Sequence, residues 1–399
     1  MKLHTRTLLF PAIASLLVAC TTETIVTKPA PGEDPGTEPT PPGTDPGTPP
    51  VTDPGKPKDP PKPPTLTADG AFSAITDATH ELYAAAPGAG GAVYVTLRKA
   101  GGSIGWGNGT LVRRYLDDGS RDTTFGAQGE LDTKLVANPQ AIAVDAKGNV
   151  LVGGSGHPDA DAGNEVVVMR VTPAGAVDAT YGSGGRVKMT TFGTANTFTT
   201  SLRVRDDGGT FVAVYGRTNG KDRFGGHLVS PAGAVVTGFG TNGFMSSPFP
   251  TDGALTIGDD VAVPTTSGYL RYGPDGAAKG TLIRDGVAMA KKAPDGSFIA
   301  VVSDGTSLSL AHFSASGAKD PAFAESKVSD DFVDYVPLAD GSVITADGAD
   351  IAWVSPAGGA STVLVKGARA SALQLTDKGK LLVTSGSGGK GGKVARYTL

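Results

Sequence analysis

The chain has 399 residues, with 35 basic and 39 acidic side chains and a formal net charge of −4 at pH 7. This near balance argues against nucleic acid as a partner, because proteins that bind phosphate backbones carry a marked basic excess. A single cysteine excludes an internal disulfide. Beyond the N-terminal leader no run of 18 apolar residues occurs and no helical periodicity is sustained, so we expect neither a membrane span nor a helical domain.

Residues 1–19 have the layout of a signal peptide: basic residues precede an apolar run at residues 8–18 that is too short to span a bilayer. The Leu-Val-Ala-Cys sequence at residues 17–20 resembles the lipobox of bacterial lipoproteins. That resemblance implies cleavage before Cys20 and lipidation of the cysteine, and the threonine that follows favours the outer membrane in that family. The alternative is a chance cysteine at the end of an ordinary secretory signal.

Residues 28–64 hold roughly half of the prolines of the chain and almost no apolar side chain. Such a segment cannot form a core, and it is expected to adopt extended polyproline II conformation and act as a spacer. Fully extended, it would reach on the order of 100 Å. We therefore divide the chain into a signal peptide at residues 1–19, a lipidated N-terminus with a spacer at residues 20–64, and a folded domain at residues 65–399.

The folded domain repeats one strand and one turn. In residues 111–131 an apolar strand runs into an Asp-Asp-Gly turn and the segment DTTFGAQG follows; residues 168–185 and 227–243 repeat this layout. Glycine permits the positive φ that tight turns need. The turn glycines recur at separations of 41 to 58 residues, and they are Gly119, Gly175, Gly233, Gly276, Gly317 and Gly358. A period of this length, made of strands and turns, is typical of β-propeller blades.

A β-hairpin pattern precedes most copies, as in AIAVDAKGNVLVGG at residues 141–154. We predict an all-β, seven-bladed β-propeller in which the hairpin supplies the two inner strands of a blade, the glycine-turn strand is third and the Phe-Gly segment is outermost. Seven blades require residues 255–285 to form a short blade; otherwise the ring has six. The chain ends directly after a third strand, so residues 66–76 are expected to pair beside residues 396–399 and close the ring.

Two motifs recur together. The first is Arg or His, then an aromatic residue or Val, then three residues and Gly, and the second is D-x-x-(Phe/Tyr)-Gly-x-x-Gly at residues 122–129 and 178–185. The combination resembles the delta-60 repeat family of bacterial envelope proteins. The AVDAKGNVLV hairpin is similar to blades of the NHL type. The resemblance covers residues 82–243 by motif and the remainder by period alone. It implies a propeller and no known reaction.

Catalytic motifs do not emerge. The histidines that follow the signal peptide, His80, His157, His227 and His312, fall in different blades and none has a zinc-ligand spacing. We place His227 and His312 at the position that other copies give to arginine, which favours a structural role. We predict no catalytic residue and no cofactor.

Candidate binding residues lie in the loops that join second to third strands, which open beside the channel mouth. The long loops are residues 98–110, 155–165, 215–226 and 385–392, and loops on a rigid scaffold are where binding residues concentrate. The candidates are Trp106, His157, Asp159, Asp161, Arg217, Lys221, Arg223 and Lys390. Asp159, Asp161 and Glu165 are also spaced like part of a calcium loop, although a solvated loop is the preferred interpretation because the full ligand set is absent.

We therefore expect a monomeric outer-membrane lipoprotein that displays a non-enzymatic propeller on a tether. Its partners would be the membrane, through the lipid anchor, and a protein or glycan of the cell envelope. The alternative is a hydrolase or lyase at the channel mouth. That function requires at least two acidic or histidine side chains within hydrogen-bond reach of each other in a pocket.

Overall fold

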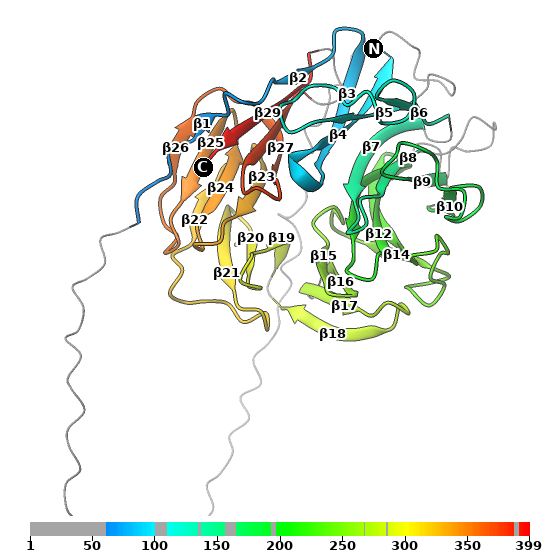
Figure 1. Cartoon of the computed structure of the whole chain (residues 1–399). Coiled ribbons are helices and arrows are strands. Elements are labelled where there is room, and N and C mark those ends of the chain that lie inside the picture. Colours follow the sequence, from blue (N-terminus) through cyan, green and yellow to red (C-terminus); the bar gives the residue numbers. More distant parts are fainter. Residues whose placement is uncertain are drawn as a thin grey trace, which may run out of the picture. The chain divides into compact units, whose positions relative to one another are not determined.

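The computed structural model describes residues 61–99, 110–134, 137–155, 165–192, 197–266, 268–284, 286–386 and 391–399. In these ranges the chain forms seven antiparallel sheets, or blades, arranged around a central channel (Figure 1). The all-β, seven-bladed prediction is confirmed. The six-bladed alternative is wrong, because residues 255–283 form four paired strands. No helix in the described part of the chain has the length and apolar character needed to cross a membrane.

The blades follow one another in sequence. Blade 1 contains β3 (His80–Pro87), β4 (Val93–Lys99), β5 (Thr110–Tyr115) and β6 (Glu130–Asp132), with a 3-10 turn η1 (Ala89–Gly91) between its first two strands. Blade 2 contains β7 (Ala137–Val144), β8 (Val150–Ser155), β9 (Glu165–Val171) and β10 (Arg186–Thr190). Blade 3 contains β11 (Phe198–Val204), β12 (Thr210–Thr218), β13 (Lys221–Val229) and β14 (Phe244–Ser247). Blade 4 contains β15 (Leu255–Ile257), β16 (Asp260–Thr265), β17 (Gly268–Tyr272) and β18 (Ala278–Ile283).

The remaining blades repeat this arrangement. Blade 5 contains β19 (Val287–Lys292), β20 (Phe298–Ser303), β21 (Leu308–Phe313) and β22 (Ser326–Val328). Blade 6 contains β23 (Phe332–Pro337), β24 (Val343–Asp347), β25 (Asp350–Val354) and β26 (Thr362–Val365). Blade 7 contains β27 (Ala370–Leu375), β28 (Leu381–Ser385) and β29 (Lys393–Thr398), and it is completed by β1 (Thr67–Ala68) and β2 (Ile75–Thr76) from the N-terminal side.

The core is divided among the seven interfaces between adjacent blades. The second strands are almost uninterrupted apolar runs, such as VLVGGS in β8 and FIAVVS in β20, and nearly all of their residues are buried. A strand that is buried on both faces has such a continuous apolar sequence, whereas a strand with one exposed face alternates between apolar and polar residues. One apolar cluster lies at each interface, including the one between blades 7 and 1, where Phe72, Ile75 and Leu82 pack together.

The N-terminal strands close the ring as predicted. Thr67 pairs with Thr398, and Ile75 pairs with Val394, so β1 and β2 both add to the edge of β29. Both Phe72 and Ile75 are buried, with 8% and 3% of their surface exposed. Closure removes the unpaired edge that β29 would otherwise present to other chains.

The D-x-x-(Phe/Tyr) tail does not form the outermost strand, so this part of the prediction is wrong. In blade 1 the backbone N–H of Asp122 donates to the carbonyl of Arg114, and that of Phe125 donates back to Asp122, so the tail is a tight turn. The outer strand β6 begins only after it. The N–H of Gly126 then donates to the carbonyl of Ala174 in the next blade, at 2.9 Å, so this tail fastens blade 1 to blade 2.

The turn glycines receive these tails. Gly175 has a φ of 82°, which an L-residue rarely adopts, and a Cβ at this position would clash with the backbone of Gly126 in the preceding blade. Gly119 is placed in the same way against the backbone of Ser73. The glycine period therefore reflects both turn conformation and contact between blades.

One predicted equivalence between blades is wrong by one residue. The N–H of Val236 donates to the carbonyl of Leu228 as that of Asp122 does to Arg114, so Leu228, and not His227, occupies the arginine position in blade 3. Val236 replaces the aspartate of the other tails. His312 does occupy the arginine position, and its Nδ1 lies 2.9 Å from Asp320.

His227 is instead buried among apolar side chains, with 3% of its surface exposed. Its Nδ1 lies 2.7 Å from the carbonyl oxygen of Gly243, so it donates a hydrogen bond to that oxygen in the neutral form. Burial lowers its pKa to about 4, which keeps the ring neutral at pH 7.

Candidate functional site

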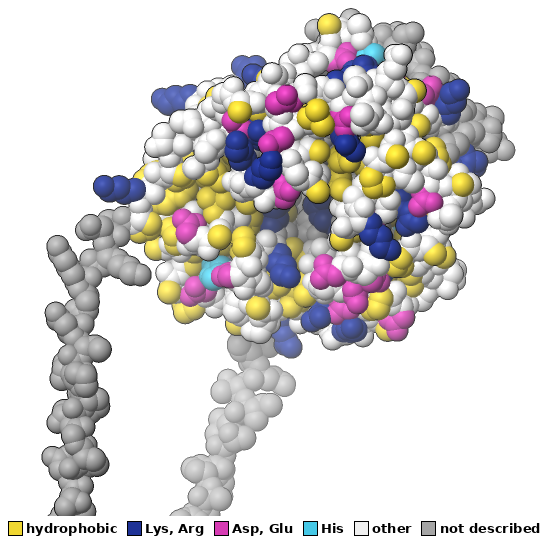
Figure 2. Space-filling model, viewed as in Figure 1, with side chains coloured by type: hydrophobic (Ala, Val, Ile, Leu, Met, Phe, Trp, Pro, Cys, Tyr) yellow, Lys and Arg dark blue, Asp and Glu magenta, His cyan; other side chains and the backbone are white. Residues whose placement is uncertain are grey.

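The first strands of all seven blades line the central channel. They enclose a cavity of about 610 Å³, which is within the size range of small-ligand sites. Figure 2 shows the hollow at the centre of the ring, with basic and apolar side chains around it. One representative lining residue from each strand, in chain order, is Tyr83, Gln140, Thr200, Thr256, Lys291, Asp334 and Gln374. The lining thus combines hydroxyl, amide, charged and apolar groups.

In blades 1, 3, 6 and 7 a β-bulge places an additional side chain at the channel. The pairing of β3 with β4 skips Tyr83, and the corresponding first strands of blades 3, 6 and 7 skip Thr200, Val333 and Ser371. An inserted residue of this kind stays outside the ladder and redirects its side chain. All four of these residues line the cavity. Val333 is 38% exposed although it is large and apolar.

A charged pair spans three neighbouring blades in the channel. The Nζ of Lys291 in blade 5 lies 2.5 Å from Oδ1 of Asp334 in blade 6. The other carboxylate oxygen of Asp334 accepts the N–H of Leu373 in blade 7 at 2.8 Å. The ammonium also lies 5.3 Å from the ring centroid of Tyr335. Both partners of the ion pair are partly exposed, so the pair faces the channel with a fixed geometry.

Arg203 binds the backbone that leads into blade 4. Its guanidinium donates to the carbonyl oxygens of Asp252 and Ala254, at 2.5 and 3.2 Å. The hydroxyl of the buried Tyr269 donates to the carbonyl of Gly253 between them, at 2.9 Å. Burial raises the pKa of Tyr269 far above its ordinary value, so this donor stays protonated.

Several predicted site residues lie outside the described residues, namely Trp106, His157, Asp159, Asp161, Lys390 and the lipidation candidate Cys20. Of the calcium candidates only Glu165 is described. It begins β9, and its carboxylate lies 3.8 Å from Nζ of Lys188. In the described ranges no group of three or more His, Cys, Asp or Glu side chains is placed to hold a metal ion.

The predicted loop at residues 215–226 is a long β-hairpin instead. Strands β12 and β13 remain paired as far as Thr218 and Lys221, and the two-residue Asn-Gly turn between them has φ angles of 52° and 76°. Asn-Gly is the preferred sequence for such a turn. Arg217, Lys221 and Arg223 are exposed on this arm and do not line the channel. Arg217 lies 3.6 Å from Asp222 on the paired strand.

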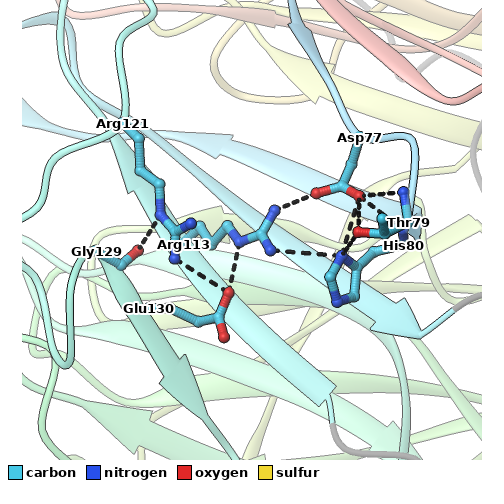
Figure 3. A network of polar contacts seen from close by, with 7 residues as sticks. All are labelled: Asp77, Thr79, His80, Arg113, Arg121, Gly129 and Glu130. Carbon is cyan, nitrogen blue, oxygen red and sulfur yellow. Dashed lines mark hydrogen bonds and ion pairs between the residues drawn. The ribbon is translucent and has the colours of Figure 1, made fainter.

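A second polar network lies at the start of β3, beside the ring closure (Figure 3). Oδ1 of Asp77 accepts the N–H groups of Thr79 and His80, at 2.8 and 2.6 Å, and Oδ2 pairs with Arg113. Nε of Arg113 donates to Glu130 at 2.7 Å. Burial alone would raise the pKa of Asp77, but the bonds from Arg113 and from Thr79 hold it well below its ordinary range. The network fixes the path from β2 into blade 1.

The comparisons with known proteins assign the chain to no family. No protein-family model and no curated protein matches the sequence. Among solved structures, a protein of unknown function from Bacteroides caccae is 12% identical, with 73% of this chain and 93% of that chain covered and a TM-score of 0.35. The CNH domain of AfRom2 is 11% identical over 84% and 98%, with a TM-score of 0.45.

An α-L-arabinofuranosidase, arb93a from Fusarium graminearum, is 8% identical over 84% of this chain and 98% of that chain, with a TM-score of 0.46. Likeness at this level selects neither a family nor an activity for this chain.

The channel residues Lys291, Asp334 and Arg203 were not among the sequence-based candidates. The only sequence signal for them is their place in the first strand of each hairpin, directly before the turn in the case of Lys291 and Lys292. Which of them faces the channel depends on the bulges, and these leave no mark in the apolar pattern.

Proposed function

We propose that this protein is a non-enzymatic binding scaffold, anchored in the outer membrane through a lipid on Cys20, that takes its ligand at the central channel of the propeller. The observation that supports channel binding is a cavity of about 610 Å³ to which all seven blades contribute. A closed ring holds these side chains in place before a ligand arrives, and preorganisation reduces the entropic cost of binding.

The hydrogen bonds of the charged pair support a binding role. Oδ1 of Asp334 accepts from Lys291 and from the N–H of Tyr335, and Oδ2 accepts from the N–H of Leu373. Each carboxylate oxygen can accept two hydrogen bonds, so Oδ2 keeps one position open to a donor on a ligand. The pair is therefore suited to orienting a polar ligand.

The test uses two matched variants of the propeller, with envelope extract as the source of ligand. Val333→Trp fills the channel from an exposed position, whereas Lys221→Glu with Arg223→Glu changes the β12–β13 arm, which the sequence analysis favoured. We expect the first variant to lose the bound envelope component and the second to retain it. The opposite result would show that the ligand binds to the β12–β13 arm and not in the channel.

The anchor is tested separately. Cys20→Ala is expected to leave the protein unlipidated and either uncleaved or released from the membrane fraction, because an acyl anchor holds only through its buried chains. Fractionation followed by mass spectrometry of the N-terminus measures this. Membrane retention of a cleaved Cys20→Ala protein would show that another element anchors it.

A further inference from the structure

A second, widely open depression, of about 590 Å³, lies where the first strands of blades 1, 5, 6 and 7 end. We call it the basic mouth. It is continuous with the channel, since Lys291, Lys292 and Gln374 line both cavities. Most of its remaining lining is apolar and includes Pro87, Pro294, Pro337 and Leu375.

The charge of the basic mouth has one sign. Among the described residues that line it, the ionisable side chains are Lys291 and Lys292, and no acid is present. Asp334, the partner of Lys291, lines the channel and not the mouth. Lys292 is exposed, and its ammonium makes no ion pair with another described residue. An unpaired cation beside an apolar surface is complementary to an amphipathic anion, which has a negatively charged group and an apolar part.

Besides these ammonium groups, Gln374 supplies the one polar side chain among the described residues that line the rim. Three of its residues are prolines, which have no N–H to donate. A sugar would leave most of its hydroxyl groups unpaired on such a surface, at a cost in free energy for each buried group. An aliphatic chain meets no such penalty and gains from every methylene that it removes from water.

We infer that the basic mouth binds a medium-chain aliphatic carboxylate, with the carboxylate on Lys292 and the chain against the prolines and Leu375. This inference rests on the proposed function, because it assigns the chemical class of the ligand that enters the channel. Lys292 is the main electrostatic contact, since Asp334 already neutralises Lys291.

The first experiment is calorimetric titration of the full chain, carrying Cys20→Ser so that no attached lipid competes, with decanoate below its micelle concentration. We expect saturable binding that strengthens by up to about fourfold for each methylene added between octanoate and decanoate. Acetate tests the head group alone, and decanol and decyltrimethylammonium test the chain without a negative charge. All three are expected to bind more weakly than decanoate. Equal binding of decyltrimethylammonium would overturn the inference.

The second experiment repeats the titration on variants at exposed positions, where folding is not at risk. Lys292→Gln is expected to weaken decanoate binding by about two- to tenfold, and Pro294→Glu, which adds a negative charge to the rim, by at least as much. Lys327→Gln is the matched control, because Lys327 is exposed on the outer strand β22 of the same blade. Affinity that is unchanged in both mouth variants would overturn the inference.

The two proposals fail in distinguishable ways. If decanoate does not bind but envelope material is captured by the wild-type protein and lost with Val333→Trp, the ligand class is wrong and channel binding stands. If neither decanoate nor channel-dependent material binds, both are wrong.

Discussion

The junction between blades 2 and 3 lies within one continuous stretch of chain, whereas the junction between blades 7 and 1 joins residues from opposite ends of the domain. In blade 2, Nε of Arg170 lies 2.7 Å from Asp178, and its guanidinium lies 4.5 Å from the ring centroid of Tyr181. The N–H of Gly182 then donates to Ala232 in blade 3 at 2.9 Å.

The ring closure repeats these contacts one for one. Nε of Arg396 lies 2.7 Å from Asp69, and its guanidinium lies 4.5 Å from the ring centroid of Phe72. The N–H of Ser73 donates to Asp118 in blade 1 at 2.8 Å. Asp69, Phe72 and Ser73 are therefore the tail of the last repeat, supplied by the N-terminal side of the domain.

The closure differs from the continuous junction in its extra charges. Asp69 also accepts from Lys380 at 2.6 Å, and Asp117 bridges Arg396 and Lys378, each at 2.5 Å. Blade 2 orders its tail a few residues after its third strand. Blade 7 must recruit its tail from a distant part of the chain, which costs more loop-closure entropy. We infer that the additional ion pairs offset this cost.

The strongest test of the comparison removes the tail. Deleting residues 66–76 is expected to destabilise the domain by about 3–6 kcal/mol, because Phe72 and Ile75 each lose about 1.5–3 kcal/mol of apolar burial. It also exposes the edge of β29, so we expect oligomers. Chemical denaturation and size-exclusion chromatography measure both effects, with a deletion of residues 28–60 as the control. A deleted protein that stays monomeric and melts like the parent would show that β1 and β2 do not close the ring.

The next test compares two equivalent arginines. Arg396 has 1% of its side chain exposed and contacts two carboxylates, whereas Arg170 has 15% exposed and contacts one. We expect Arg396→Met to destabilise the fold by about 3 kcal/mol and Arg170→Met by about 1 kcal/mol or less. Equal losses in urea denaturation would mean that the closure needs no more support than the continuous junction.

The number of blades is predictable from the sequence because each turn position needs glycine for two reasons. The backbone there has a positive φ, and a tail packs directly against it. The sequence also contains the tail of blade 7, since Asp69 and Phe72 have the spacing of Asp122 and Phe125. Because this tail precedes its own third strand in the chain by more than 300 residues, the order of motifs in the sequence does not connect the two. The Asn-Gly pair at residues 219–220 is likewise a sequence signal for the hairpin that replaces the expected loop.

The channel was not predictable in the same way. Whether Val333 or Asp334 stands outside the ladder depends on a one-residue shift against β24. A shift of this size exchanges the faces of a strand without altering its composition. The apolar pattern therefore determines the blades but not the side chains that line the channel.

The closure should also be visible in the pH dependence of stability. The bond from Lys380, together with that from Arg396, outweighs the effect of burial and lowers the pKa of Asp69 to about 2, from an ordinary value of 3.8. The folded state therefore holds this proton less tightly than the unfolded state. The resulting stability is fully present above the unfolded pKa and is lost as the pH falls through about 2. We expect the stability difference between wild type and Asp69→Asn to shrink from pH 5 to pH 2, measured by urea midpoints. A difference that stays constant over this range would contradict the lowered pKa.

The smallest expected effect concerns blade 5, where His312 replaces the arginine. Nδ1 of His312 lies 2.9 Å from Asp320, and 24% and 35% of the two side chains are exposed. An exposed pair of this kind contributes between zero and about 1 kcal/mol. Unlike Arg396, His312 has one carboxylate partner, and that partner follows it closely in the same stretch of chain. His312→Arg, which restores the residue found in blades 1, 2, 4 and 7, is therefore expected to change the free energy of unfolding by about 0.5 kcal/mol or less at pH 7. Denaturation of His312→Arg beside Arg396→Met measures both in one series. A gain of several kcal/mol from His312→Arg would mean that the Arg–Asp pair stabilises every blade equally, and the special role of the pair at the ring closure would be lost.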